Sequence, residues 1–145
     1  MFLLDTNVVS ELRKAGTGRA NPAVVAWAQD AAAATLFLPV IVVLEIERGV
    51  LMAERRDPAQ GAALRAWLED RVLPAFEGRI LPVDTAVARR CAVLHVPDPK
   101  SDRDALIAAT ALVHGMTVVT RNVADFMVTG VPLLDPFADT DMTSR

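Results

Sequence analysis

The sequence contains a single cysteine, Cys91, among its 145 residues. One cysteine cannot form an internal disulfide, and its place in the run 90–94 predicts a small buried thiol. We therefore expect a reducing compartment, the cytoplasm. Only two histidines occur, His95 and His114, and neither lies at metal-ligand spacing from another soft ligand. A zinc site is therefore not expected.

Long hydrophobic runs are absent as well. The longest, 36–44, is too short to span a bilayer and contains Pro39. The first residues carry neither a basic flank nor a long apolar run, so we expect no signal peptide and a soluble protein without a membrane partner. Tyrosine is missing, and Phe and Trp are few, so a platform for stacking bases is not expected. Trp27 and Trp67 fit helix cores or partner-binding faces better.

Charge of one sign is not in large excess, since the net charge is −3. Bulk composition therefore does not indicate nucleic-acid binding, and an RNA partner would need a local basic patch. The basic residues near the motifs described below are candidates for that patch. They are Arg13, Lys14, Arg19, Arg48, Arg55, Arg56, Lys100, Arg103 and Arg121.

Hydrophobic residues make up 52% of the chain, enough for the core of one domain. Short apolar runs predict strands at 1–4, 35–38, 79–83, 116–119 and 131–134. Helical spacing and caps predict helices at 8–14, 22–34, after Pro39 through Leu51, from Pro58 to Val72, and at 84–95, 101–114 and 122–127. Alternating strands and helices indicate an α/β sandwich with a mostly parallel sheet.

Acidic side chains recur where such a sheet binds ligands, outside the carboxyl ends of its strands. Asp5 directly follows the first predicted strand, and the segment 120–122 directly follows the fourth. Glu45 lies on the helix after the second strand, and Asp104 in the first turn of the helix that leads into the fourth. Residues far apart in the sequence are thus expected to converge on one edge.

Each acid also has a simpler explanation. Asp104 completes a sequence that resembles a capping box, 101–104, and the segment 122–125 has a similar pattern. Asp5 could cap the short helix that follows it. Glu45 is different, because it stands between Leu44 and Ile46, where a solvated carboxylate is not expected.

A joint explanation is favoured by electrostatics. Two carboxylates about 4 Å apart repel by roughly 4 kcal/mol at an effective dielectric constant near 20. A hard divalent cation removes that repulsion, and carboxylate oxygens suit Mg²⁺ or Mn²⁺. Such an ion would activate water for attack on phosphorus and stabilise charge on the departing oxygen.

Four segments in order carry a specific resemblance. They are 3–11 (LLDTNVVSE), 43–49 (VLEIERG), 104–111 (DALIAATA) and 119–126 (VTRNVADF). They resemble the motifs of PIN-domain proteins, and above all the VapC and FitB toxins of bacterial type II toxin–antitoxin pairs. The likeness extends over 1–137, including the segment 78–82 found in FitB-like members, and leaves 138–145 as a C-terminal tail.

The resemblance implies a PIN-like three-layer α/β/α sandwich with about five strands. It also implies a Mg²⁺-dependent endoribonuclease toxin, for which Mn²⁺ can substitute. The implied partners are RNA as substrate, a cognate antitoxin, a second copy in a homodimer, and DNA only through the antitoxin. By position, Asp5, Glu45 and Asp104 match the acidic ligands of the family. Asp5 and Asp104 would touch the metal directly, while Glu45 would coordinate it or orient the attacking water. The residues expected to support this site are Thr6, Asn7, Thr120, Asn122 and Asp125.

One departure weakens the fourth acidic position. Many members have an acid where this chain has Asn122. Either Asp125 compensates, or the site holds one ion firmly and recruits a second with substrate. The same departure supports an alternative reading, a PIN-like module of weak or no activity that binds protein or RNA. A phosphatase-like hydrolase would need a second acid two residues after Asp5, where this chain has Asn7.

Overall fold

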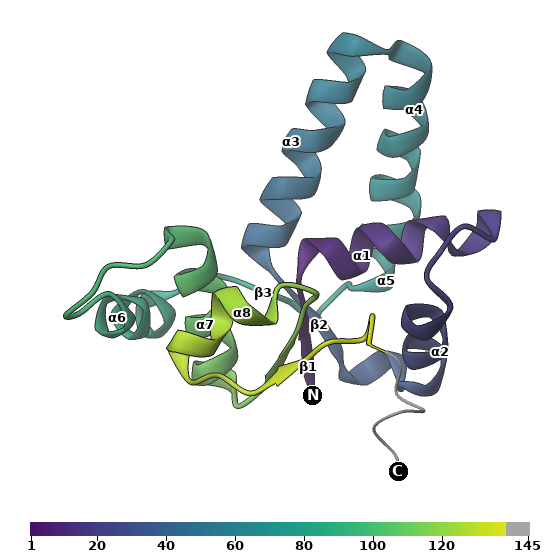
Figure 1. Ribbon diagram of the computed structural model, residues 1–145. Helices are drawn as coiled ribbons and strands as arrows, with labels where there is room; N and C mark the ends of the chain where they lie inside the picture. Colours follow the sequence, from purple (N-terminus) through teal and green to yellow (C-terminus); the bar gives the residue numbers. More distant parts are fainter. Residues whose placement is uncertain (139–145) are drawn as a thin grey trace.

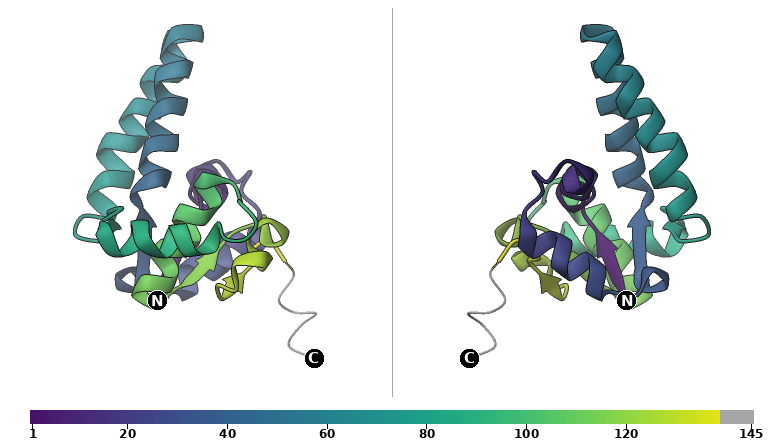
Figure 2. Two further views of the ribbon diagram at one scale, coloured as in Figure 1. Left: turned by 90° about the vertical axis from the view of Figure 1, so that its left-hand side faces the viewer. Right: turned by 90° about the vertical axis from the view of Figure 1, so that its right-hand side faces the viewer.

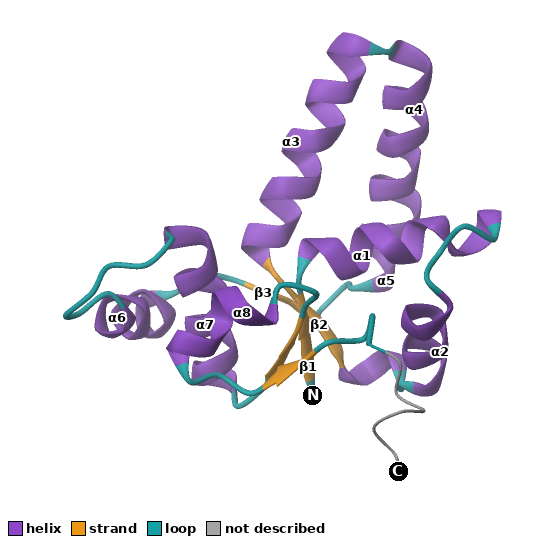
Figure 3. Cartoon of the chain, viewed as in Figure 1, coloured by secondary structure: helices purple, strands orange, loops and turns teal. Residues whose placement is uncertain are grey.

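The computed structural model describes residues 1–138, and a single parallel sheet forms its centre (Figure 3). Its strands are β1 (Phe2–Leu4), β2 (Leu36–Pro39), β3 (Ile80–Leu81), β4 (Thr117–Val119) and β5 (Leu133–Leu134). They lie in the order β3-β2-β1-β4-β5, and each neighbouring pair is parallel. The predicted five-stranded parallel sheet is confirmed. Of the predicted tail 138–145, all but Ala138 lies outside the described residues.

Helices cover both faces of this sheet (Figure 1). Within the described residues they are α1 (Thr6–Arg13), α2 (Pro22–Asp30), α3 (Val40–Arg56), α4 (Pro58–Trp67), α5 (Leu73–Ala75), α6 (Thr85–Leu94), α7 (Asp102–His114) and α8 (Val123–Phe126). Along the chain, β2 and β3 are added on one side of β1, and β4 and β5 on its other side. Because such crossovers are right-handed, α1 to α5 lie on one face of the sheet and α6 to α8 on the other. The expected three-layer α/β/α sandwich is confirmed.

The two central strands form the middle of the core. Leu3 and Leu4 of β1 and Val118 and Val119 of β4 have no exposed surface, as continuous apolar runs predict for strands covered on both faces. The pairing continues one residue further, because the backbone N–H of Asp5 donates to the carbonyl of Val119 at 3.0 Å. The core therefore fixes the point at which Asp5 leaves the sheet.

The helices α3 and α4 form a hairpin that rises away from the sheet (Figure 2). Asp57 joins them, and its side chain accepts a hydrogen bond from the backbone N–H of Gln60 at 3.3 Å. Leu51 of α3 is 52% exposed because it lies on the side of the helix turned away from the core, whereas the preceding Val50 is buried in the core. Within residues 1–138, no helix combines the length and the hydropathy needed to cross a bilayer.

Several predicted boundaries were wrong. The helix predicted at 22–34 begins at Pro22 but ends at Asp30, and a 3₁₀ turn at Ala33–Thr35 precedes β2. Pairing of β2 with β1 requires extended backbone from Leu36, and this tertiary demand overrides the helix propensity of the alanine run. The helix predicted from Pro58 to Val72 becomes π-helical over Leu68–Val72 and continues directly into α5. The predicted buried thiol is confirmed: Cys91 is buried, and burial, followed by the charge of Asp102, raises its pKa.

The hairpin tolerates no side chain at Gly61. A Cβ built there would lie 2.4 Å from Cα of Glu54. We expect Gly61→Ala to lower the free energy of unfolding by about 1–3 kcal/mol through overpacking. Gly49 is the matched control, since it lies in α3 with no atom within 4 Å of an added Cβ. Gly49→Ala should raise stability by about 0.4–1 kcal/mol. Urea unfolding measures both, and equal stability of the two variants would contradict this close helix contact.

Candidate active site

Acidic and hydroxyl side chains meet at the carboxyl edge of the sheet, as the sequence predicted. Asp5 leaves β1 and Thr120 leaves β4, and both residues are fully buried. The hydroxyl of Thr120 donates to Oδ2 of Asp5 at 2.8 Å. Two segments that lie 115 residues apart in the chain are therefore joined at this edge.

The carboxylate of Asp5 is held on both oxygens. Its Oδ2 also accepts from Nδ2 of Asn7 at 3.3 Å, and its Oδ1 accepts from the backbone N–H of Thr6 at 2.7 Å. Asp5 is the N-cap of α1, so helix capping explains its contact with the backbone N–H of Thr6. The remaining contacts come from outside the cap and fix the direction of the carboxylate.

Glu45 reaches the same edge from α3. Its Oε1 accepts from the hydroxyl of Thr6 at 2.5 Å, and its side chain is 18% exposed. Burial alone would raise the pKa of Glu45, but hydrogen bonds from Arg103 and Thr6 outweigh burial and hold that pKa below its ordinary value of 4.5. Neighbouring Leu44 is 52% exposed, so Glu45 lies at a rim and not in an apolar interior.

Asp104 joins the group from the first turn of α7. Its backbone N–H donates to Oγ of Ser101 at 3.3 Å, so Ser101 is the cap that the sequence suggested. Its carboxylate does not complete a capping box among the hydrogen bonds of residues 1–138. It accepts instead from Nη1 of Arg103 at 2.8 Å.

Arg103, which the sequence analysis offered only as a candidate for a basic RNA-binding patch, lies among the acids instead. Its guanidinium contacts all three carboxylates, with Nε 2.5 Å from Oε2 of Glu45 and Nη2 bonded to both Glu45 Oε1 and Asp5 Oδ1. Burial alone would lower the pKa of Arg103, but its hydrogen bond to Glu45 and the charge of Asp5 raise that pKa, so the side chain stays cationic. Three acids that share an edge need a nearby cation, and this need was the only sequence signal for the contact of Arg103 with the acids.

The remaining expected residues lie beside the group or outside it. Oδ1 of Asn7 accepts from the backbone N–H of Arg121 at 3.1 Å, and the backbone N–H of Asn122 donates to Oγ1 of Thr120 at 3.0 Å. Asn122 and Asp125 are exposed. Asp125 is not among the acids that Arg103 contacts in residues 1–138, and the compensation suggested for it stays a prediction.

The donor chemistry of the group fits a hard cation, but its present occupant is the guanidinium. Carboxylate oxygens are the ligands that Mg²⁺ and Mn²⁺ prefer. In the described part of the chain no three Asp, Glu, His or Cys side chains stand close enough to hold one ion. Arg103 lies between the carboxylates that the sequence analysis assigned to the metal.

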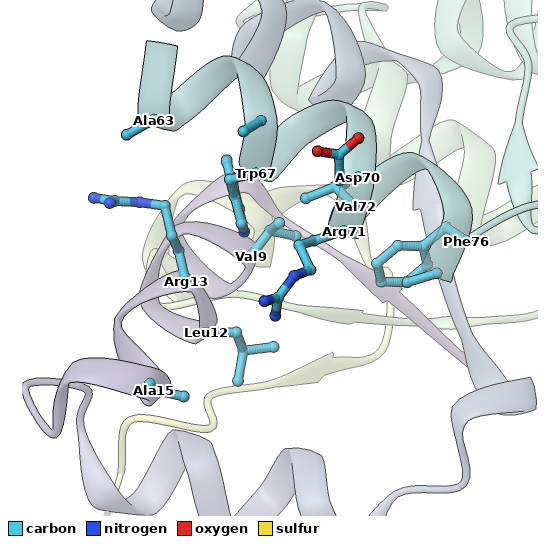
Figure 4. Close-up of a pocket in the computed structure, with 13 residues that line it drawn as sticks. Val9, Leu12, Arg13, Ala15, Ala63, Trp67, Asp70, Arg71, Val72 and Phe76 are labelled. Atoms are coloured by element: carbon cyan, nitrogen blue, oxygen red, sulfur yellow. The ribbon is translucent and has the colours of Figure 1, made fainter. Parts of the chain in front are cut away.

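Two cavities share lining residues, and the smaller one reaches this group at Thr6 and Glu45. The smaller, of about 300 Å³, is lined by Thr6, Glu45, Arg13 and Trp67 among others. The larger, of about 730 Å³, shares Arg13 and Trp67 and continues to Arg71 (Figure 4). The guanidinium carbon of Arg13 lies 5.9 Å from the centre of the Trp67 ring. A path lined mainly by apolar and basic side chains, with the acid Asp70 in the larger cavity, thus begins at Glu45.

Comparison with known proteins gives a consistent set of matches. The family pattern described as PIN domain matches residues 2–126. VapC ribonuclease Y4jK of Sinorhizobium fredii is 38% identical over 142 residues, covering 94% of this chain and 98% of that protein. Toxin FitB of Neisseria gonorrhoeae is 36% identical over 145 residues, covering 96% of this chain and 100% of the toxin. The crystal structure of FitAcB from Neisseria gonorrhoeae superposes with a TM-score of 0.87 at 34% identity, over 96% of this chain and 100% of that chain.

Glu45→Gln should weaken the metal-free protein in a pH-dependent way. The substitution removes the charge that Arg103 and Thr6 stabilise, and near neutral pH we expect a loss of about 1–3 kcal/mol of unfolding free energy in EDTA. Because the pKa of Glu45 is lowered on folding, its contribution is present above 4.5 and is lost as the pH falls through the lowered value. The difference between wild type and variant should therefore shrink in acid.

Urea unfolding at a series of pH values measures this difference. Glu69→Gln is the control, since Glu69 is 58% exposed and lies 3.5 Å from Arg65. It should change stability by less than about 0.5 kcal/mol. A difference for Glu45→Gln that stayed constant into strong acid would contradict the lowered pKa.

Proposed function

The chain belongs to the PIN-domain family, and from that premise we propose that it is an endoribonuclease that serves as the toxin of a toxin–antitoxin pair. The observation that carries the proposal is the convergence of Asp5, Glu45 and Asp104 at the carboxyl edge of the sheet. Two relatives that match nearly the whole chain, a VapC ribonuclease and Toxin FitB, support the same function.

The activity is proposed to depend on Mg²⁺, with Mn²⁺ as a substitute. Asp5 and Asp104 would hold the ion, and Glu45 would coordinate it or orient the attacking water. When bound, the ion would lower the pKa of water and stabilise negative charge on the leaving oxygen of the phosphodiester. One such ion is proposed, because Asn122 stands where an additional acid would favour a second.

The chain's own residues supply the orientation. Asn7 and Thr120 donate to Oδ2 of Asp5. Its Oδ1 faces Arg103, which also contacts Glu45 and Asp104. Thr6 holds Oε1 of Glu45 through its hydroxyl. These hydrogen bonds fix two carboxylates before any ligand arrives, and such preorganisation reduces the cost of assembling the site.

RNA is proposed to lie along the path that begins at Glu45. Arg13 lines both cavities, and among the described residues it forms no ion pair within 4 Å, so its charge is available for a phosphate. On a protein of net charge −3 such local contacts must supply the attraction to RNA. Recognition would then depend mainly on phosphate position and on RNA shape.

The proposed partners are an antitoxin and a second copy of the chain. Solved relatives include a complex described as FitAB bound to an IR36 DNA fragment, which matches this chain at a TM-score of 0.86 and 34% identity. We propose that an antitoxin forms a complex with this chain, inhibits it, and makes any contact with DNA. A PIN module without activity is the second candidate, favoured by Asn122 and by the guanidinium among the acids.

Cleavage of RNA in vitro tests the enzymatic proposal. We expect the purified protein to cut RNA with Mg²⁺ or Mn²⁺ and to stop in EDTA. Asp5→Asn should reduce the rate by about 10²-fold or more, because it removes one charge that holds the ion. Asp30→Asn is the control, since Asp30 is an exposed residue at the end of α2. Full activity of folded Asp5→Asn, or undiminished cleavage in EDTA, would refute the proposal.

Expression in a bacterial host tests the toxin proposal. Wild type should arrest growth, whereas Asp5→Asn at equal abundance should not. Co-expression of the small protein encoded beside this chain should relieve the arrest by forming a complex that co-purifies. Normal growth with abundant, folded wild-type protein would reject the toxin role and leave the ribonuclease proposal to the cleavage assay.

A further inference from the structure

One guanidinium holds three carboxylates that come from three different elements. Asp5 follows β1, Glu45 lies on α3 and Asp104 lies on α7, while Arg103 lies in the first turn of α7. The distances are 2.5 Å and 2.9 Å to the two oxygens of Glu45 and 2.8 Å to Asp104, and the contact with Asp5 Oδ1 completes the set. Every donor nitrogen of the guanidinium group is engaged with an acid.

These are the oxygens that a metal ion would need. The interior oxygen of Asp5, Oδ2, is taken by Thr120 and Asn7, so Oδ1 is the one that faces the group. Arg103 occupies that Oδ1, both oxygens of Glu45 and Oδ1 of Asp104. A divalent ion and the guanidinium therefore compete for one set of donors.

Arg103 can leave this position without a change in the fold. Its side chain is 31% exposed, whereas that of Asp5 is fully buried. It is a long side chain at the start of a helix, and rotation about its own torsions carries the guanidinium into solvent. Removal of the guanidinium without a replacement would leave three neighbouring negative charges, so a second cation must take its place.

We propose that Arg103 is a resident counter-cation that holds Asp5, Glu45 and Asp104 together in the metal-free protein and competes with the divalent metal for them. Metal binding then requires the guanidinium to move out, and the apparent metal affinity is reduced by the fraction of molecules in which Arg103 is bound to the acids. This inference rests on the metal dependence proposed above, but it concerns metal binding and not RNA cleavage.

A second arginine provides a matched control. Arg65 on α4 also contacts three carboxylates, those of Glu47, Glu54 and Glu69, at 2.6 Å, 3.1 Å and 3.5 Å. None of these acids belongs to the proposed metal site. Loss of Arg65 therefore removes an arginine of similar ion pairing and leaves the candidate site unchanged.

Calorimetric titration of the metal-free protein with Mn²⁺ tests the competition. We expect Arg103→Met to bind Mn²⁺ at least about tenfold more tightly than wild type. This ratio corresponds to wild-type protein in which the guanidinium is bound to the acids in about nine-tenths of the molecules. Arg103→Lys keeps the charge but cannot span three carboxylates, so it should fall between these two. Arg65→Met should bind Mn²⁺ as wild type does.

Thermal unfolding supplies a readout independent of affinity. In EDTA, Arg103→Met should melt at a lower temperature than wild type, because the acids lose their counter-charge. Saturating Mn²⁺ should raise its melting temperature more than that of wild type. If Arg103→Met does not fold, both measurements are made on Arg103→Lys, which retains a cation at the site.

Each contrary result has a distinct meaning. Equal Mn²⁺ affinity of wild type, Arg103→Lys and Arg103→Met would overturn the competition and leave the metal site standing. Weaker binding by Arg103→Met would also overturn it, because Arg103 would then help to build the site. No Mn²⁺ binding by wild type or any Arg103 variant would reject both the competition and the metal dependence.

Discussion

The convergence of three carboxylates on one sheet edge is the constraint on which the rest of the site depends. A parallel sheet brings Asp5 to this edge, and α3 and α7 bring Glu45 and Asp104 beside it. At separations of about 4 Å each pair of such charges repels by roughly 4 kcal/mol at an effective dielectric constant near 20. The fold therefore needs a cation here, and in the metal-free protein Arg103 supplies it.

The same constraint links stability to the proposed activity. The hydrogen bonds from Thr6, Asn7 and Thr120 fix the carboxylates of Asp5 and Glu45 beside the guanidinium of Arg103, where we propose that a divalent ion can replace it. Arg103 keeps that arrangement assembled when metal is absent, at the cost of competing with metal when it is present. In the proposed mechanism, metal-dependent ribonuclease activity thus begins with an exchange of cations.

Much of this could be predicted from the sequence, because the decisive signals are local. Buried apolar runs predicted β1 and β4, and Gly115 ends α7 in the left-handed conformation expected of such a glycine. The motifs around Asp5 and Glu45 predicted the PIN-domain family, which the comparisons confirm. What failed depends on tertiary context: pairing of β2 shortened α2, and the position of the Arg103 side chain follows from acids on other elements.

A crystal of the metal-free protein soaked in Mn²⁺ tests the exchange of cations most directly, since the anomalous signal of Mn²⁺ locates the ion. We expect one peak bounded by the carboxylates of Asp5, Glu45 and Asp104, with the guanidinium of Arg103 moved away from all three. Absence of a peak at this position, with Arg103 still bound to the acids at a Mn²⁺ concentration that supports RNA cleavage, would contradict the central claim.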